Sequence, residues 1–284
     1  MVEDVTIGHS NVLTGKRESE IKMPRLGLGV WQMIGEGECK SAVSHALNSG
    51  YRLIDTARAY SNEQETGEAV IESDLPREEI FVVTKLRRVE AVGYEETIAQ
   101  CKSSLEKLGL EYMDLYLVHA PPEDIEARPH VWKGMEECLA LGLTRSIGVS
   151  NYGAHHLDEM RSYATVLPSI NQIEIHVLNQ RPALCAATRA IGAIPMGYSP
   201  LARGQKILVD ERLKKIADSA GCTPAKAAIK WVYDTGAIVI PKSSNPERIE
   251  ENLASIEINL AGSEEAIASM EEGYVSGWNP TIEH

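Results

Sequence analysis

The sequence lacks several features that would assign it to other classes of protein. Its longest apolar runs, such as residues 237–241, fall far short of the roughly 20 residues that a membrane-spanning helix needs. The 22 glycines and 13 prolines are spread along the chain, which argues against collagen-like, disordered and solenoid structures. The five cysteines are widely spaced and include no C-x-x-C pair. They predict reduced thiols that fill the core.

Basic residues are scarce as well. Lys and Arg together number 28 against 41 Asp and Glu, which gives a formal net charge of −13. Such a surface repels a polyanionic backbone, so we expect no nucleic-acid partner. The first ten residues, MVEDVTIGHS, lack a basic segment followed by an apolar stretch. We therefore expect no secretory signal, no membrane association and a cytoplasmic location.

Short apolar runs alternate with helical patterns along most of the chain. The eight expected strands are 26–30, 52–55, 80–85, 114–119, 146–150, 170–175, 193–197 and 237–241. Helix-period apolar stripes lie between them. Eight such units without a Gly/Ser linker predict one domain over residues 1–284, an α/β fold of the (β/α)8 TIM barrel type. Residues 5–23 are expected to form a β-hairpin that closes the barrel bottom, with its turn near Thr14 and Gly15.

Polar side chains stand near the predicted carboxyl ends of these strands. In chain order they are Asp55, Lys85, His119, Ser150, Asn151, Gln172, Tyr198, Lys242 and Ser243. Each one alone is more simply explained as a cap, a turn residue or a solvated strand end. A barrel strand, however, should be apolar on both faces, and the carboxyl ends of all strands meet at one rim. Together they predict an active site there.

Four of the residues in this region suggest acid–base chemistry. Tyr60 follows Asp55 by five residues and can fold back over the neighbouring strand ends. A phenol with a pKa near 10 donates its proton poorly unless a cation stabilises the phenolate, and Lys85 could supply that cation. Asp55 could keep Lys85 charged despite its burial. His119 could hydrogen-bond a substrate oxygen or relay the proton.

A second polar cluster follows the last predicted strand. Asn245 and Pro246 form an N-cap and first-turn pair that begins a helix. The surrounding polar side chains are Lys242, Ser243, Ser244 and Arg248. A helix N-terminus with two cations and two hydroxyls predicts a phosphate site on an otherwise acidic protein. The sequence contains no G-x-G-x-x-G motif and no P-loop. It also contains no metal-binding pattern, so we expect no metal.

The sequence around these residues resembles the aldo-keto reductase superfamily from about Met23 to about Glu272. The signature stretch reads DTARAYSNE (55–63), preceded by GYR (50–52). The other matching segments are FVVTKL (81–86), DLYLVHAP (114–121), SIGVSN (146–151), NQIEIH (171–176), YSPLARG (198–204) and IPKSSNPERIEEN (240–252). Seven ordered segments are far more specific than a single motif.

The resemblance implies an NADPH-dependent enzyme that reduces a small aldehyde or ketone. It implies that Tyr60 is the general acid, that Lys85 and Asp55 tune it, and that His119 orients the carbonyl. It also implies the contacts with the cofactor. The nicotinamide end is contacted by Ser150, Asn151 and Gln172 at the carboxamide and by Tyr198 on the ring, and the pyrophosphate by Ser199 and Leu201. The 2′-phosphate is contacted by Lys242, Ser243, Ser244 and Arg248, and the adenine by Glu251 and Asn252.

Two departures from the family pattern bear on the substrate. Ala120 stands where the family often has a bulky aromatic residue, and few residues follow Trp278. We therefore expect an open pocket, with Trp31 as one wall, that accepts small reactive carbonyls. We also expect a monomer or a weak homo-oligomer.

Two other functions remain open from the sequence. A Schiff-base aldolase would use Lys85 on the same barrel, although it leaves Tyr60 and the phosphate cluster without a role. A nicotinamide-binding regulatory module of the same superfamily would bind the cofactor, with turnover secondary to a partner.

Overall fold

Eight parallel strands enclose the centre of the molecule in the computed structural model, which describes residues 2–12, 17–204 and 206–283. They are β3 (Leu28–Gly29), β4 (Leu53–Asp55), β5 (Phe81–Leu86), β6 (Leu115–Val118), β7 (Ile147–Ser150), β8 (Ile170–Glu174), β9 (Ile194–Tyr198) and β10 (Ile238–Ile240). Each strand falls inside its predicted range, except that β5 and β9 each extend one residue beyond the predicted end. The strands are almost entirely buried, as expected for strands covered on both faces.

The strands follow one another around the sheet in chain order, from β3 to β10. The backbone next to β3 then bonds to β10, since Gly27 N donates to Val239 O at 3.0 Å and Val239 N donates to Arg25 O at 2.9 Å. These bonds join the first strand to the last. The predicted (β/α)8 barrel is therefore confirmed.

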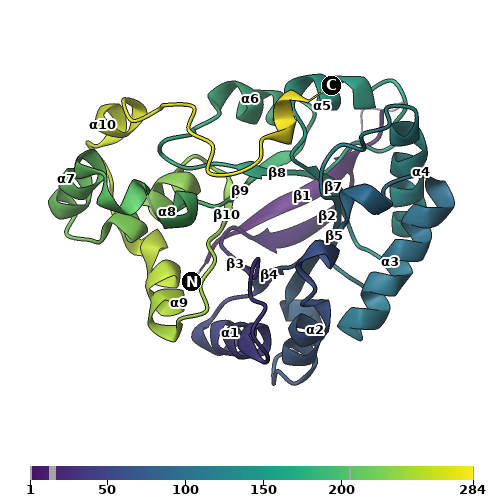
Figure 1. The fold of residues 1–284 in the computed structure, drawn as a ribbon, viewed down its shortest axis with the longest axis horizontal. Helices are drawn as coiled ribbons and strands as arrows, with labels where there is room; N and C mark the ends of the chain where they lie inside the picture. The colour runs from purple at the N-terminus through teal and green to yellow at the C-terminus, as the bar shows by residue number, and fades with distance from the viewer. Residues whose placement is uncertain (1, 13–16, 205, 284) are drawn as a thin grey trace.

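Helices surround the barrel (Figure 1). They are α1 (Glu38–Ser49), α2 (Glu63–Ile71), α3 (Tyr94–Leu108), α4 (Ala127–Ala140), α5 (Ala154–Met160), α6 (Pro182–Ala190), α7 (Glu211–Ser219), α8 (Pro224–Asp234), α9 (Pro246–Leu253) and α10 (Glu264–Ala268). Short 3₁₀ turns are η1 (Arg58–Tyr60), η2 (Arg77–Glu79), η3 (Arg88–Glu90), η4 (Ala202–Gly204), η5 (Ile207–Val209), η6 (Ala254–Glu257) and η7 (Pro280–Ile282). The predicted cap of α9 is present, because Asn245 Oδ1 accepts a hydrogen bond from Arg248 N at 3.0 Å.

An antiparallel hairpin of β1 (Asp4–Ser10) and β2 (Arg17–Pro24) crosses one end of the ring (Figure 1). Ile7 and Met23 are fully buried in one cluster with side chains of the barrel strands, among them Leu53, Leu115 and Ile170, each in the first position of its strand. His9 Nε2 lies 3.3 Å from Ile147 N, where β7 begins. The hairpin therefore closes the bottom of the barrel, as predicted. The expected turn at Thr14 and Gly15 lies outside the described residues.

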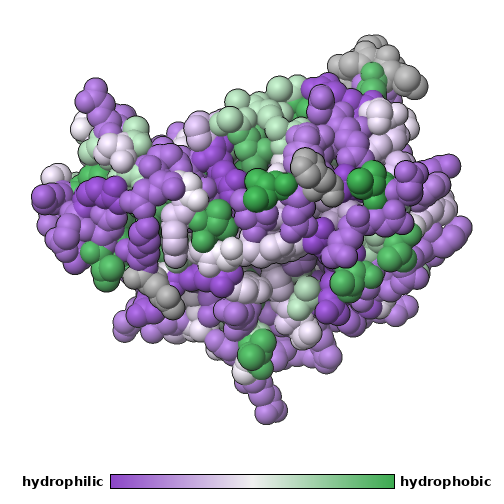
Figure 2. All heavy atoms as spheres, turned by 45° about the horizontal axis from the view of Figure 1, so that its top comes forward, coloured by the Kyte–Doolittle hydropathy of each residue, from purple (hydrophilic) through white to green (hydrophobic). Residues whose placement is uncertain are grey.

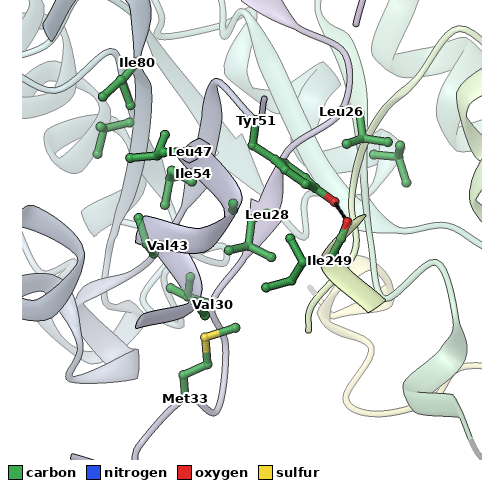
Figure 3. Close-up of a cluster of buried hydrophobic side chains, with 14 of the residues drawn as sticks. Leu26, Leu28, Val30, Met33, Val43, Leu47, Tyr51, Ile54, Ile80 and Ile249 are labelled. Carbon is green, nitrogen blue, oxygen red and sulfur yellow. Dashed lines mark hydrogen bonds between the residues drawn. The ribbon is translucent and has the colours of Figure 1, made fainter. Parts of the chain in front are cut away.

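One apolar cluster joins β3 and β4 to α1 and α9 (Figure 3). Burying each of its large aliphatic side chains contributes about 1.5–3 kcal/mol to stability. Within it, the Tyr51 hydroxyl donates a hydrogen bond to the Ile249 carbonyl at 2.9 Å. This bond anchors α9, the helix of the predicted phosphate site, to the barrel wall.

The face of the molecule that Figure 2 shows is mostly polar. In Figure 2 hydrophobic side chains form small separate groups among hydrophilic ones. Within the described residues, no helix combines the length and apolarity needed to cross a membrane. The five cysteines are all free, and four of them are buried, which fits their predicted role in the core.

We expect Gly67→Ala to destabilise the protein by about 2–3 kcal/mol, the scale of an overpacked interior. A Cβ at Gly67, in the middle of α2, would lie 1.8 Å from the carbonyl oxygen of Leu108, so α2 would have to move away from the C-terminal end of α3. The denaturant midpoint measures the effect. Gly93→Ala is the matched control, because nothing lies within 4 Å of a Cβ there. Equal midpoints for the two variants would contradict this account of α2 packing.

Candidate active site

A buried ion pair stands at the carboxyl ends of β4 and β5. Lys85 Nζ lies 2.6 Å from Asp55 Oδ1, and both side chains are almost fully buried. The ammonium also donates to the Thr56 carbonyl at 2.8 Å. Because β4 and β5 are neighbouring parallel strands, their last residues meet at the rim, as the sequence predicted.

Tyr60 is brought over this pair by η1. Its hydroxyl lies 3.4 Å from Lys85 Nζ. Its ring makes an edge-to-face contact with His119, with ring centroids 5.6 Å apart. Tyr60 and His119 are both partly exposed, whereas Lys85 is not. The structure therefore brings the four predicted catalytic residues together, with a phenol and an imidazole facing the rim and a cation behind the phenol.

Burial sets the charge states of these groups. It lowers the pKa of Lys85 and raises that of Asp55, while the attraction between the two opposes both shifts. Burial, followed by the Asp55 carboxylate, raises the pKa of Tyr60 well above its usual value. Burial and then the Lys85 charge lower the pKa of His119 to about 3. At neutral pH Tyr60 is therefore protonated and His119 is neutral.

The residues predicted to bind the nicotinamide form a hydrogen-bonded chain beside this pair. Gln172 Nε2 donates to Asp55 Oδ2 at 2.7 Å, and Ser150 Oγ donates to the Gln172 carbonyl at 2.9 Å. The Tyr198 hydroxyl donates to Asn151 Oδ1 at 2.8 Å. Gln172 therefore orients the carboxylate that binds Lys85. The sequence did not predict this contact.

A groove of about 610 Å³ extends from the rim towards α9. The predicted residues that line it are Trp31, Ser199, Leu201, Lys242, Ser243, Ser244, Arg248, Glu251 and Asn252. The tetrad residues and Ala120 are not among its lining residues. Ala120 is buried, so its predicted part in a wide pocket stays a prediction.

The α9 end of the groove suits a phosphate group. Lys242 and Arg248 are exposed, and neither forms a salt bridge within the described ranges. Ser243 Oγ accepts the Asn245 N–H at 3.2 Å, which shapes the loop before the helix. Glu38 lies against Ser244 and near Lys242, and these contacts lower the pKa of its carboxyl. A cationic helix start on an acidic protein thus fits the 2′-phosphate of NADPH.

Asn62 and Glu63, in the signature stretch, are buried and hydrogen-bonded beside the tetrad, and the sequence analysis assigned neither a role. Asn62 is buried, donates to the Val30 carbonyl at 2.9 Å and accepts from Thr56 Oγ1 at 2.7 Å. Glu63 is buried and accepts from Thr84 Oγ1 at 2.7 Å. The available signal was their place in the signature stretch, two and three residues after Tyr60. Their burial depends on how α2 packs on the barrel.

The C-terminal residues pack beside the rim. Ser276 N donates to Glu174 Oε1 at 2.8 Å, and Arg88 Nη2 lies 2.6 Å from Glu283 Oε2. The Trp278 indole donates to Glu283 Oε1 at 2.7 Å. In Figure 1 this yellow segment runs past α6 towards α5. The residues after Trp278, although few, therefore contribute to the surroundings of the site.

The described residues contain no group of three or more His, Cys, Asp or Glu side chains arranged to hold a metal ion.

Comparison with known proteins identifies the family. Residues 25–273 match the model of the aldo/keto reductase family. The chain is 44% identical over 232 residues to methylglyoxal reductase DkgA of Escherichia coli (strain K12), covering 81% of this chain and 83% of that protein. It is 40% identical over 245 residues to morphine 6-dehydrogenase of Pseudomonas putida, covering 82% of each. A Bombyx mori aldo-keto reductase, solved in complex with NADP, superposes with a TM-score of 0.85 at 31% identity, covering 98% of this chain and 96% of that one.

Proposed function

This chain belongs to the aldo/keto reductase family, and from that premise we propose that it reduces small aldehydes or ketones to alcohols, with Tyr60 as the proton donor. It is an oxidoreductase with NADPH as its cofactor. The observation that carries the proposal is the position of the Tyr60 hydroxyl, 3.4 Å from the ammonium of a fully buried lysine. A phenol held beside a cation at a barrel rim is suited to general acid catalysis.

NADPH, when bound, supplies the hydride for the carbonyl carbon. Tyr60 gives its proton to the carbonyl oxygen, where negative charge develops, and the Lys85 ammonium stabilises the phenolate that is left. The Asp55 carboxylate, 2.6 Å from Lys85 Nζ, opposes the loss of the lysine proton that burial favours. Neutral His119, in contact with the Tyr60 ring, orients the carbonyl through a hydrogen bond.

The groove supports a dinucleotide in one orientation. Tyr198 and Asn151 lie beside the tetrad and would hold the nicotinamide. Lys242 and Arg248, at the start of α9, would hold the 2′-phosphate. The buried bond from Tyr51 to Ile249 fixes α9 relative to the barrel and so sets the distance between the two ends.

Small reactive carbonyls, such as α-dicarbonyls and activated aromatic aldehydes, are the proposed substrates. One similar protein is named a methylglyoxal reductase and another a morphine dehydrogenase, so family membership alone leaves the substrate open. A panel in which only bulky steroid ketones react would contradict this proposal. A cytoplasmic location and a monomeric or weakly associated state stay predictions.

NADPH oxidation with methylglyoxal and with 4-nitrobenzaldehyde, followed by absorbance, tests the proposed function directly. We expect turnover with NADPH and slower turnover with NADH. If NADPH binds but neither aldehyde nor any of a broad set of ketones is reduced, the binding-module alternative replaces the reductase.

Arg248→Ala should lower the preference for NADPH over NADH about tenfold, because a hydrogen-bonded cation at the 2′-phosphate contributes only to NADPH binding. The measurement is the ratio of kcat/KM values for the two cofactors. Lys230→Ala is the matched control, since Lys230 pairs with Asp234 on α8 and does not line the groove. An unchanged ratio in Arg248→Ala would remove Arg248 from the 2′-phosphate site.

The Schiff-base alternative meets a geometric obstacle. Lys85 is fully buried and donates to Asp55 and to the Thr56 carbonyl, so its nitrogen is neither free nor accessible to a carbonyl carbon. Borohydride trapping of a substrate on Lys85 would be the result that restores the aldolase.

A further inference from the structure

Tyr60 stands on a short loop that leaves β4 and returns to begin α2. The loop is closed by a side-chain bond, because Thr56 Oγ1 donates to Asn62 Oδ1 at 2.7 Å. Ser61, next to the tyrosine, has a φ of 60°, in the left-handed region that residues other than glycine seldom adopt. Such a conformation persists where the surrounding structure holds it. The position of the phenol therefore depends on how the two ends of this loop are fixed.

Two consecutive residues of β5 hold these ends. Lys85 Nζ donates to the Thr56 carbonyl at 2.8 Å, before the tyrosine in the chain. Thr84 Oγ1 donates to Glu63 Oε1 at 2.7 Å, after it. Because neighbouring residues of a strand point to opposite faces, Lys85 reaches the loop from inside the barrel and Thr84 reaches it from the helix layer. Tyr60 is thus bracketed by two bonds to the strand that carries its cation.

The bond between Thr84 and Glu63 is sheltered from solvent. Both side chains are almost fully buried. Burial raises the pKa of the Glu63 carboxyl, whereas its contacts with Thr84 and Ser104 and the charges of Lys107 and Arg58 oppose that shift. Breaking a buried hydrogen bond leaves a donor and an acceptor unsatisfied, which costs more than the loss of an exposed one. The bond is therefore a firm link between α2 and β5.

The helix alone does not account for a buried acid at this position. Glu63 is the first residue of α2, where the helix dipole favours a carboxylate. That effect does not require burial, and burying a carboxyl has a cost in free energy. What burial adds is the contact with β5, next to Lys85 and three residues after Tyr60.

We propose that Glu63 and Thr84 are positioning residues for the reduction, whose bond holds the Tyr60 hydroxyl beside the Lys85 ammonium. The inference rests on the proposed function, because it assumes that Tyr60 is the proton donor. Without the bond the loop can move, and the hydroxyl no longer stays 3.4 Å from Lys85 Nζ. The rate of proton transfer depends steeply on such placement. Neither Glu63 nor Thr84 lines the groove, so the binding of NADP+ does not depend on them.

Thr84→Val tests the link, because it removes the hydroxyl and keeps the shape of the side chain. We expect kcat to fall about tenfold, less than the roughly hundredfold loss that a misplacement of about 1 Å can cause. The Kd of NADP+, measured by calorimetry, should stay native. Thr84→Ser keeps a hydroxyl donor and should recover most of the lost kcat.

Thr144→Val is the matched control. Thr144 is equally buried, and its Oγ1 donates to the Ser146 carbonyl at 2.7 Å, just before β7 begins. This substitution removes a buried bond of the same kind far from the carboxyl ends of the strands. It should leave kcat unchanged. A loss of kcat equal to that of Thr84→Val would show that any weakened core lowers activity, and would overturn the proposal.

A background without the phenol hydroxyl separates positioning from a general loss of structure. In Tyr60→Phe, the further substitution Thr84→Val should lower kcat no more, because the link acts only through the hydroxyl that is already missing. Equal fold losses in the native and Tyr60→Phe backgrounds would overturn the proposal.

Glu63→Gln distinguishes the bond from the charge. The amide oxygen of glutamine can still accept the hydrogen bond from Thr84, so this variant should keep most of the native kcat. If it is as impaired as Thr84→Val, the charge of the carboxylate acts and the proposed link is wrong. Should Thr84→Val fail to bind NADP+ and so prove unfolded, Glu63→Leu takes its place as the variant without the bond.

The outcomes also separate this inference from the function on which it rests. If Tyr60→Phe keeps the native kcat, the proposed proton donor is wrong. If Tyr60→Phe loses activity and Thr84→Val keeps it, only the positioning roles of Glu63 and Thr84 are wrong.

Discussion

Tyr60→Phe is expected to lower kcat about a thousandfold, within the range for the loss of a general acid. The substitution keeps the ring, and with it the edge-to-face contact with His119, and removes only the hydroxyl that lies 3.4 Å from Lys85 Nζ. Without that donor, negative charge on the carbonyl oxygen would have to be neutralised by solvent. NADPH oxidation under saturating aldehyde measures the effect.

The binding of NADP+ to Tyr60→Phe should remain close to native, because the change lies at the tetrad and not in the groove. A matched control is Tyr94→Phe, at the start of α3, where the ring faces Lys133 of α4 and does not line the groove. Retention of more than a tenth of native kcat in Tyr60→Phe would show that another group donates the proton, and His119 would be the next candidate.

Lys85→Met should abolish most of the activity and also destabilise the fold by about 3–5 kcal/mol, the cost of leaving one member of a buried ion pair without its partner. Asp55 would keep its bond from Gln172, but its carboxylate would stay buried beside an apolar side chain. Denaturant unfolding measures the stability, and NADPH oxidation measures the activity.

The stability loss in Lys85→Met should depend on pH in a defined direction. Burial already raises the pKa of Asp55, and removal of the ammonium raises it further. A carboxyl with a raised pKa in the folded state binds more protons when folded than when unfolded, so stability falls as pH rises through that pKa. The destabilisation should therefore be largest at neutral pH and should shrink as the pH approaches the ordinary carboxyl pKa.

The double variant Asp55→Asn/Lys85→Met separates structure from catalysis. Removing both charges eliminates the unpaired carboxylate, so most of the stability should return while the activity does not. If the double variant is as unstable as the single one, the loss comes from packing around residue 85 and not from the charge of Asp55.

The sequence by itself determined the elements of this fold and which polar side chains gather at the rim of the barrel. All eight strands were predictable because strands covered on both faces need continuous apolar runs. The start of α9 was predictable because the N-cap bond of Asn245 is local. Asp55, Lys85 and His119 stood out because polar residues at the ends of buried strands need a reason to be there, and the order of the strands then placed them on one rim. Tyr60 stood out because it follows Asp55 by only five residues and can fold back over the strand ends.

Other parts of the site were decided only by the tertiary structure. The bond from Gln172 to Asp55 spans 117 positions of the chain, and the contact of Arg203 with Trp31 joins the loops that follow β9 and β3. The burial of Glu63 depends on how α2 packs, and the place of Ser276 depends on Glu174 at the end of β8. Apolar periodicity and capping act over a few residues. Contacts between distant side chains are set by loop conformation and by the closure of the barrel, which no local pattern records.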